Sequence, residues 1–398
     1  MNSKQLWIWL TVCFGPANKR KWEVLSGYES IDEFYRSFMR GNVLNLTADE
    51  KKRMKNTDAD KISQIENYCN AKGINIYCYD DDEFPQRLRE IFNPPSILFV
   101  KGDISSLDSE VLVTVAGARE LSDYSRSVEE NIVHGLCDAG IQIVSGVQIG
   151  ADQVASLAAI EHGAKSYAVL GFGMEYEYPK GSTELLDKIA RNGAVISEYF
   201  PNHKPRTKDF HFRNRILSAL SLGVLIVQAS ASSGSLSIAE FALNQGKDIF
   251  VIPPHDINDN AYKGNIRLFR DGAIPVFSEL DILNEYKNNY SHRLNFSASY
   301  EREFEPPATT KISNKKQTNK ANETDPDSFV KTVKETQTDL SGVSDVGMKI
   351  LDSLKSGVST ADELADKLSV DVLDLALELT ELEISGIIKA LPGRRYSL

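Results

Sequence analysis

Cysteine and histidine are scarce in this chain, which argues against several kinds of functional site. Its 398 residues include four cysteines and six histidines. No cysteine stands at a CxxC or CxxH spacing, and no HExxH pair occurs. A disulfide framework or a zinc site is therefore unexpected. We predict free thiols in a reducing cytoplasm and no bound metal.

Long apolar runs are also missing. The run from Leu6 to Phe14 is broken by Gly15-Pro16 and is far shorter than the roughly 20 residues of a membrane-spanning helix. It also lacks the small-residue cleavage site that ends a signal peptide. We expect this run to be a helix of the core, and we expect the protein to have no membrane anchor.

The chain has no overall excess of positive charge, since its formal net charge is -11. A protein this acidic does not coat nucleic acid over its whole surface, so any site for a polyanion must be local. One stretch fits, because residues 204–215 hold five Lys or Arg and one Asp. It places the ring of Phe210 close to Arg213, Asn214 and Arg215. Aromatic rings beside guanidinium groups are typical of surfaces that bind a single nucleic-acid strand.

Two common phosphate-binding signatures, GxGxxG and GxxxxGK[ST], are absent. Redox chemistry with a dinucleotide and ATP hydrolysis through a P-loop are therefore poorly supported. The spacing of residues also reveals no Ser-His-Asp arrangement. Glu198 and Asp152 follow predicted strands and could act as acid–base groups. We favour instead helix capping or a role in orienting Arg213 and Arg215, and we expect no catalysis.

Between residues 73 and 286 the chain alternates short β-rich runs with amphipathic helical stretches. The runs are apolar throughout, which is typical of strands buried on both faces of a parallel sheet. We predict an α/β core built on such a sheet, preceded by a helical domain at residues 1–72. The strands are expected at 74–79, 97–100, 111–115, 141–144, 167–170, 194–196, 224–227, 249–252 and 274–277, and the helices of the core at 123–138, 151–162, 182–192, 213–221 and 235–246.

The last third of the chain divides into a linker and a small domain. Residues 287–344 have few apolar side chains, so we predict a disordered linker. Residues 345–398 regain helical periodicity and end in a predicted hairpin, which is the plan of a winged-helix domain. The expected third helix, 371–384, holds five acidic residues and no Lys or Arg. Phosphates would repel it, so we interpret that face as solvated or as a protein-contact surface.

Four turns that follow predicted strands carry glycine, serine or a cation. They contain Arg119, Ser145-Gly146, Lys180 and Ser233-Gly234-Ser235. Glycine is needed at many tight turns, so one such turn alone says little. The carboxyl ends of parallel strands meet at one edge, however, and helix N-termini there offer N–H groups to phosphates. Four such turns, with two cations among them, favour a shared anion site.

Six short motifs follow one another between Gly117 and Leu236. They are Gly-x-Arg, Ser-Gly-x-x-x-Gly-x-Asp, Tyr-Pro-Lys, Ser-Glu-Tyr, Phe-x-x-Arg-Asn-Arg-Ile and Ser-Gly-Ser-Leu. In this order they resemble the DNA-processing protein A (DprA/Smf) family, whose entry segment is also matched by residues 84–88 and 93–95. The resemblance implies a SAM-like N-terminal domain, an extended Rossmann-like core and a winged-helix C-terminus.

The resemblance also implies a function. Members of that family are similar in binding single-stranded DNA, in dimerising through the Rossmann-like core and in loading the recombinase RecA during natural transformation. No cofactor is implied. By position, the resemblance implies strand contacts at Arg119, Lys180, Phe210, Arg213, Asn214 and Arg215, and a phosphate cradle at Ser145, Gly146, Ser233, Gly234 and Ser235.

The chain departs from the family pattern at three places. Gln148-Ile149 stands where the family has Ala-Arg, His211 where it has proline, and Pro253-Pro254 where it has Pro-Gly. The missing arginine would remove about one phosphate contact. Two other functions stay open. The core could bind or cleave free nucleotides through Glu198 and Asp152, or the chain could be a scaffold whose acidic C-terminal helix docks a protein.

Overall fold

The structure is a computed structural model in two compact units, Met1–Glu305 and Pro306–Leu398, and each is described by itself. The predicted linker at 287–344 falls mostly on residues 297–343, which lie outside the described residues. Over the parts of the chain that are described, no helix is both long and apolar enough to cross a membrane. The structure describes residues 1–43, 45–296, 344–355, 359–368, 372–385, 387–391 and 395–397.

Nine strands in the described part of the first unit form one mixed sheet, in the order β1-β2-β6-β5-β4-β3-β7-β8-β9. Each of the nine predicted runs overlaps one of these strands. The prediction of a parallel sheet is confirmed for the seven neighbouring strands β6-β5-β4-β3-β7-β8-β9. Strand β2, however, runs antiparallel to both β1 and β6. An apolar run indicates that a strand is buried on both faces, but it does not indicate the direction in which the strand runs. The sequence therefore could not show that β2 is antiparallel to its neighbours. The bounds are β1 Asn75–Cys78, β2 Ile97–Gly102, β3 Leu112–Ala116, β4 Gln142–Ser145, β5 Ser166–Leu170, β6 Ala194–Ser197, β7 Gly223–Ile226, β8 Asp248–Val251 and β9 Ile274–Pro275.

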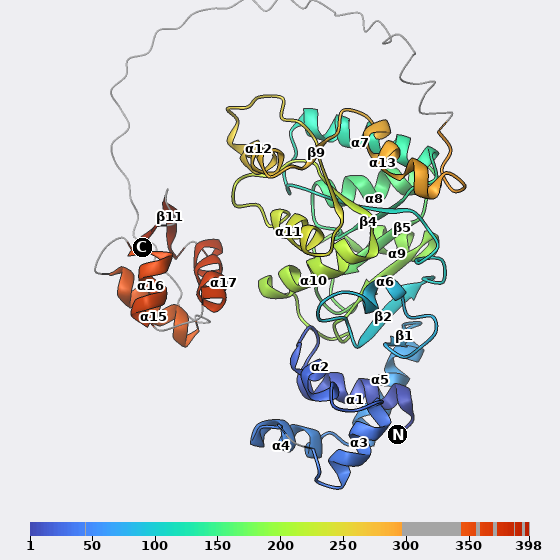
Figure 1. Ribbon diagram of the computed structural model, residues 1–398, viewed down its shortest axis with the longest axis vertical. Coiled ribbons are helices and arrows are strands. Elements are labelled where there is room, and N and C mark those ends of the chain that lie inside the picture. The colour runs from blue at the N-terminus through green and yellow to red at the C-terminus, as the bar shows by residue number, and fades with distance from the viewer. Residues whose placement is uncertain are drawn as a thin grey trace, which may run out of the picture. The chain divides into compact units, whose positions relative to one another are not determined.

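Helices cover both faces of the sheet, as the apolar strands require (Figure 1). One face packs mainly against α6, α10, α11 and α12, and the other against α7, α8, α9 and α13. A short 3-10 helix, η1, precedes α12. The bounds are α6 Gln86–Arg89, α7 Asp123–Asp138, α8 Ala151–Glu161, α9 Thr183–Asn192, α10 Thr207–Leu220, α11 Leu236–Asn244, η1 Asn260–Tyr262, α12 Lys263–Arg270 and α13 Glu279–Tyr290.

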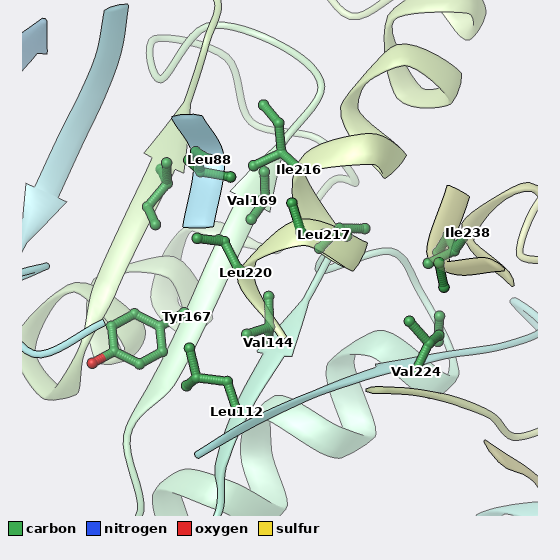
Figure 2. Packing of buried hydrophobic residues seen from close by; sticks show 14 of the residues in the cluster. Leu88, Leu112, Val144, Tyr167, Val169, Ile216, Leu217, Leu220, Val224 and Ile238 are labelled. Carbon is green, nitrogen blue, oxygen red and sulfur yellow. The ribbon is translucent and has the colours of Figure 1, made fainter. Parts of the chain in front are cut away.

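Helix α10 starts six residues before the predicted start at residue 213, so Phe210, Arg213, Asn214 and Arg215 all lie on it. Ile216, Leu217 and Leu220 pack against the sheet near Val144 and Val169 (Figure 2). Arg213 lies one turn earlier on this buried face. The sequence hid the first turns because a charged residue on the inner face breaks the apolar periodicity on which the prediction rested.

The N-terminal helices pack on the β1 and β2 end of the sheet and share a core with both strands (Figure 1). The run from Leu6 to Phe14 is confirmed as a core helix, and its start is capped by reciprocal hydrogen bonds between Asn2 and Gln5. The SAM-like assignment stays a prediction. The bounds are α1 Ser3–Phe14, α2 Arg20–Leu25, α3 Ile31–Met39, α4 Ala48–Asn56 and α5 Ala59–Ala71.

The second unit has a small core of its own, formed by residues such as Ile350, Leu364, Leu379 and Ile388. Its described helices and strands match the predicted three helices and hairpin, with a further short strand joining the hairpin. The winged-helix assignment itself stays a prediction. The bounds are α15 Asp345–Leu354, β10 Ser359–Thr360, α16 Ala361–Leu368, α17 Val372–Ile384, β11 Lys389–Leu391 and β12 Arg395–Ser397.

Candidate nucleic-acid interface

The chain order reverses at β3. Strands β4, β5 and β6 lie on one side of it, and β7, β8 and β9 lie on the other. Ligands of open α/β sheets bind at such a switch point, at the carboxyl ends of the strands. The four predicted turns follow β3, β4, β5 and β7, so the topology brings all four to this edge.

Two of the predicted cations are exposed at this edge. Arg119 follows β3 and Lys180 follows β5, and both side chains reach solvent. The Ser233–Ser235 turn, which follows β7, leads directly into α11. Gly234 is exposed, and a methyl group on its Cα would meet no atom within 4 Å. We call Arg119, Lys180 and the Ser233–Ser235 turn the sheet-edge interface.

The position of Arg119 depends on a neighbouring glycine. Gly150 precedes α8 and has a φ of +90°. A Cβ at this position would lie 2.2 Å from the carbonyl oxygen of Ala118 and 2.5 Å from that of Arg119. The turn after β4 therefore packs directly on the turn after β3. Ile149, which stands where the family has arginine, is 51% exposed.

Arg213 is buried beneath this edge and is 3% exposed. Its Nη1 donates to the carbonyl oxygen of Gly146, 3.1 Å away, and to that of Val169. Burial lowers the pKa of Arg213 to about 10, and the nearby charge of Asp152 opposes that change. Burial raises the pKa of Asp152 to about 6, against the charge of Arg213 and backbone N–H groups that include Gly146 and Gln148. Arg213 and Asp152 thus fix the turn after β4 by hydrogen bonds to its backbone.

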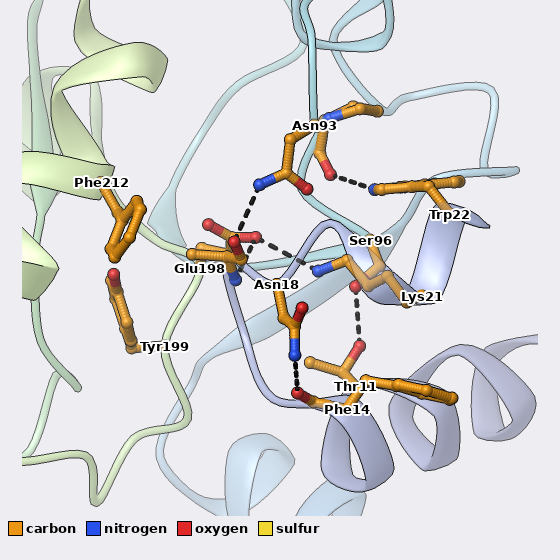
Figure 3. A network of polar contacts seen from close by, with 12 residues as sticks. Thr11, Phe14, Asn18, Lys21, Trp22, Asn93, Ser96, Glu198, Tyr199 and Phe212 are labelled. Carbon is orange, nitrogen blue, oxygen red and sulfur yellow. Dashed lines mark hydrogen bonds and ion pairs between the residues drawn. The ribbon is translucent and has the colours of Figure 1, made fainter. Parts of the chain in front are cut away.

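Arg215 is equally buried and joins three parts of the fold. Its Nη2 lies 2.7 Å from Oε2 of Glu198, which is 1% exposed. Its Nε donates to the carbonyl oxygen of Asn93, 2.9 Å away. Lys21, from α2, lies 3.5 Å from the other carboxylate oxygen of Glu198 (Figure 3). Burial alone would raise the pKa of Glu198, but the charges of Arg215 and Lys21 hold it below its usual range.

Phe210 is half-buried in an aromatic group on the β5 side of the interface. Its ring centroid lies 5.3 Å from that of Tyr178 and 6.0 Å from that of Phe172. The guanidinium of Arg213 lies 5.8 Å from the centroid of Phe210. The ring is therefore fixed in place by its neighbours, although part of it remains accessible.

The remaining predicted residues make internal contacts. Asn214 donates from Nδ2 to Oγ of Ser237, 2.7 Å away, which ties α10 to the first turn of α11. The hydroxyl of Ser145 lies 2.7 Å from that of Ser156. The N–H of Gly146 donates to Asp152. Ser233 and Ser235 share a hydrogen bond of 2.8 Å.

The structure therefore separates the predicted residues by exposure. Arg119, Lys180 and Gly234 are exposed, whereas Arg213 and Arg215 have their donors directed at protein acceptors. Contact between DNA and any of the predicted residues stays a prediction. Glu198 and Asp152 face the two buried arginines, which is the role that the sequence favoured over acid–base chemistry.

Sequence reasoning missed two features near the site. Glu129 of α7 is fully buried, and neither of its carboxylate oxygens has a hydrogen-bond partner among the described residues. Burial, with the charge of Asp152, raises its pKa well above the usual range. Lys61 lies near the segment after β6 only in the folded chain. Neither residue carried a signal, because an isolated Glu or Lys on a helix usually indicates a solvated face.

Metal ligands do not gather in the described residues, where no group of three or more His, Cys, Asp or Glu is placed to hold an ion. All four cysteines are buried free thiols. Burial raises the pKa of Cys13 and of Cys69 to about 11. Such thiols are poor nucleophiles at neutral pH.

Comparison with known proteins identifies the family of this chain. The family model described as DNA recombination-mediator protein A matches residues 75–287, more than half of the chain. DNA processing protein DprA of Bacillus subtilis is 34% identical over 214 residues, 54% of this chain and 72% of the relative. DprA of Streptococcus pneumoniae is 38% identical over 207 residues, which are 52% of this chain and 72% of the relative. Protein Smf of Escherichia coli is 30% identical over 316 residues, with 79% and 75% covered.

One solved structure gives the same result. The X-ray structure of DprA from Streptococcus pneumoniae is similar at a TM-score of 0.64 and 30% identity, over 72% of this chain and 98% of that one. A structure of DprA from Helicobacter pylori, which describes the single-stranded DNA binding mode of that protein, is 28% identical at a TM-score of 0.49, with 54% and 97% covered. This chain therefore belongs to the DNA recombination-mediator protein A family, the family of the DprA and Smf proteins.

Proposed function

We propose that this protein binds single-stranded DNA along the carboxyl edge of its sheet and delivers the strand to the recombinase RecA. It acts in the cytoplasm as a homodimer, during recombination and natural transformation, and catalyses no reaction itself. The observation that carries the proposal is the exposure of Arg119 and Lys180 on either side of the β4 turn, beside the open Ser233–Ser235 turn. Membership of a recombination-mediator family supports it.

The exposed and buried residues have different roles in this function. Arg119 and Lys180 neutralise phosphates, and the open turn at Gly234 lets another phosphate approach the backbone ahead of α11. The accessible part of Phe210 stacks on a base, worth about 1–3 kcal/mol. Arg213 and Arg215 act as positioning residues, because their ion pairs and hydrogen bonds fix α10 and the turn after β4.

Fluorescence anisotropy with labelled single-stranded and duplex DNA across a salt series tests this function. We expect a clear preference for the single strand that weakens steeply with salt. Arg119→Glu and Lys180→Glu should each weaken binding about tenfold or more and lower the salt slope by about one unit. Lys52→Glu, the same charge change on an exposed residue of α4, serves as the control. Equal affinity for duplex, or no effect of either reversal, would contradict the proposal.

Delivery to RecA needs its own assay. RecA would be added to a strand already coated by a single-strand binding protein, and its nucleation would be followed by DNA-dependent ATPase activity. We expect this protein to shorten the lag, and we expect Lys180→Glu to lose that effect. An unchanged lag with normal strand binding would leave the DNA-binding function intact and refute delivery.

One of the two catalytic candidates of the nucleotide-cleaving alternative is held inside the fold. Glu198 is buried in an ion pair with Arg215 and Lys21, so it cannot approach a substrate without breaking both contacts. Incubation with a panel of nucleotides tests this alternative directly. Release of base or phosphate would favour it over the strand-binding function.

A further inference from the structure

A cleft of about 830 Å³ lies where the N-terminal helices meet the segment that follows β6. One wall comes from α1 and α5 and includes Lys61 and Tyr68. The other comes from residues 200–204 and Arg206. Clefts of this size commonly hold one drug-sized ligand. None of the residues of the sheet-edge interface lines it.

Buried polar contacts hold the two walls in a fixed relation. Glu198, two residues before the cleft wall begins, accepts a hydrogen bond from the N–H of Ala17, 2.9 Å away. Asn93 donates to the carbonyl oxygen of Ala17 at 2.8 Å, and the hydroxyls of Thr11 and Ser96 lie 2.8 Å apart (Figure 3). The N-terminal helices are therefore tied to the core on one side of the cleft, which makes the cleft a preformed feature.

Positive charge predominates in the cleft. Lys61, Lys204 and Arg206 line it and are exposed, while Glu175 is its one Asp or Glu among the described residues. The hydroxyl of Tyr68 is hydrogen-bonded to Glu175. In a protein whose net charge is -11, three cations against one carboxylate are a local excess that fits an anionic occupant.

Aromatic and apolar side chains lie between these cations. Tyr68, Phe200 and Ile65 are half-buried and line the cleft. The ring of Phe200 packs against that of the buried Phe99, with the ring centroids 5.4 Å apart. Cations for phosphates beside exposed ring faces for bases are the combination that binds single-stranded nucleic acid without regard to sequence.

The cleft lies on the continuation of the sheet-edge interface. Strands β3, β4, β5 and β6 are neighbours in that order, and Arg119, Lys180 and the cleft wall follow β3, β5 and β6. Three strand spacings are about 15 Å, which stacked nucleotides cover in roughly four to five steps. Arg206 lies in the cleft and immediately precedes α10, which carries Phe210 back toward Lys180.

We propose that single-stranded DNA bound at the sheet-edge interface continues past β6 into this cleft, so that Lys61 and Tyr68 of α5, with Lys204 and Arg206, bind the next nucleotides. This inference rests on the proposed function. It assigns the N-terminal helices a direct part in DNA binding. It also makes affinity depend on strand length, because a short strand occupies the sheet edge alone.

Anisotropy with oligothymidylates of six and twenty nucleotides tests the extension. Lys61→Glu and Lys204→Glu should each weaken binding of the 20-mer about tenfold and leave the 6-mer unchanged. The control, Lys52→Glu on α4, should change neither. Lys180→Glu should weaken both lengths, because it removes the contact shared by short and long strands.

Stacking is tested separately at Tyr68. Tyr68→Ser should weaken the 20-mer about tenfold, while Tyr68→Phe, which keeps the ring, should restore most of the affinity. A 20-mer with a photoreactive thymine at one end should also crosslink to a peptide from α5. The crosslink reports contact with DNA directly, so a mere loss of fold would not produce it.

The outcomes separate the two proposals. If Lys180→Glu weakens binding but the Lys61, Lys204 and Tyr68 variants bind the 20-mer normally, the extension is refuted and the proposed function stands. If the wild-type protein binds neither length, both are refuted. If the cleft variants weaken binding of the 20-mer alone while Lys180→Glu weakens binding of both lengths, the extension is confirmed.

Discussion

Buried charge is the dominant feature at the scale of single residues. Lys21 is fully buried, and its ammonium shares Glu198 with Arg215. Two cations and one carboxylate leave a net positive charge inside the fold, where desolvation is costly. Burial lowers the pKa of Lys21 from its usual 10.5 to about 8, and the attraction of Glu198 only partly offsets this. Such a cluster costs stability but fixes the relation between α2, α10 and the segment after β6.

The lowered pKa of Lys21 predicts how stability changes with pH. A lysine with a lower pKa in the folded chain favours folding once it is neutral, so stability rises between pH 8 and 10.5. The gain approaches about 3 kcal/mol. Met at position 21 does not titrate, so the Lys21→Met variant lacks this rise. The free energy of unfolding of wild type minus that of the variant should therefore increase from pH 8 to pH 10.5. Urea denaturation at pH 7, 8.5 and 10 measures it, and a flat difference would contradict this account.

Glu198→Gln provides the matching comparison. It leaves Lys21 and Arg215 as buried cations without an anion, so we expect a loss of about 3–5 kcal/mol at pH 7. Lys21 would then lose its proton more readily. As the pH is raised, the free energy of unfolding of the variant should therefore begin to rise at a lower pH than that of wild type.

At the scale of elements, the starts of helices position the interface. Helix α10 fixes Phe210 and the two buried arginines, and α11 begins at the Ser233–Ser235 turn. Helix α8 begins after Gly150, whose contact with the turn after β3 leaves no room for a side chain. The place of Arg119 is thus set by the packing of one turn on another.

Gly150→Ala should therefore affect both stability and binding. Its positive φ costs an L-residue about 1–2 kcal/mol, and the clash with Ala118 adds to this, so we expect a loss above 2 kcal/mol. Because the turn must shift, affinity for single-stranded DNA should fall as well. Gly163→Ala is the control, since Gly163 has a φ of +73° at the other end of α8 but no atom within 4 Å of an added Cβ. It should lose stability through φ alone and bind DNA normally.

At the scale of the whole molecule, the site belongs to the first unit. Every residue of the sheet-edge interface and of the cleft lies within Met1–Glu305, and so do the hydrophobic cores around them. The second unit has a separate core. Each unit therefore has its own source of stability.

A chain that ends at residue 305 should fold and bind single-stranded DNA within about threefold of the full chain, because it keeps every proposed phosphate contact. Anisotropy and thermal unfolding check this. A large loss of DNA affinity would show that the second unit takes part in the site. Retained DNA binding with loss of a protein partner would favour the hypothesis that the acidic helix α17 docks a protein.

Much of the fold could be predicted because its signals are local. Apolar runs and turn residues located all nine strands, and glycine-rich and serine-rich turns indicated the carboxyl edge at which these turns meet. The direction of β2 and the early start of α10 were missed. Strand direction depends on how distant segments pair, and the first turns of α10 bury charged side chains that a periodicity of apolar residues does not reveal.

The sequence by itself determined the α/β core, the edge that carries the turns and the family, because each rests on residue order and local pattern. Only the tertiary structure decided which cations are available. In the sequence, Lys180 and Arg213 are both cations within motifs of the predicted site. In the structure, Lys180 is exposed, whereas Arg213 is buried beside Asp152. The cleft between α5 and the segment after β6 likewise exists only in the folded chain. Burial and ion pairing depend on contacts between residues far apart in sequence, and spacing along the chain does not record those contacts.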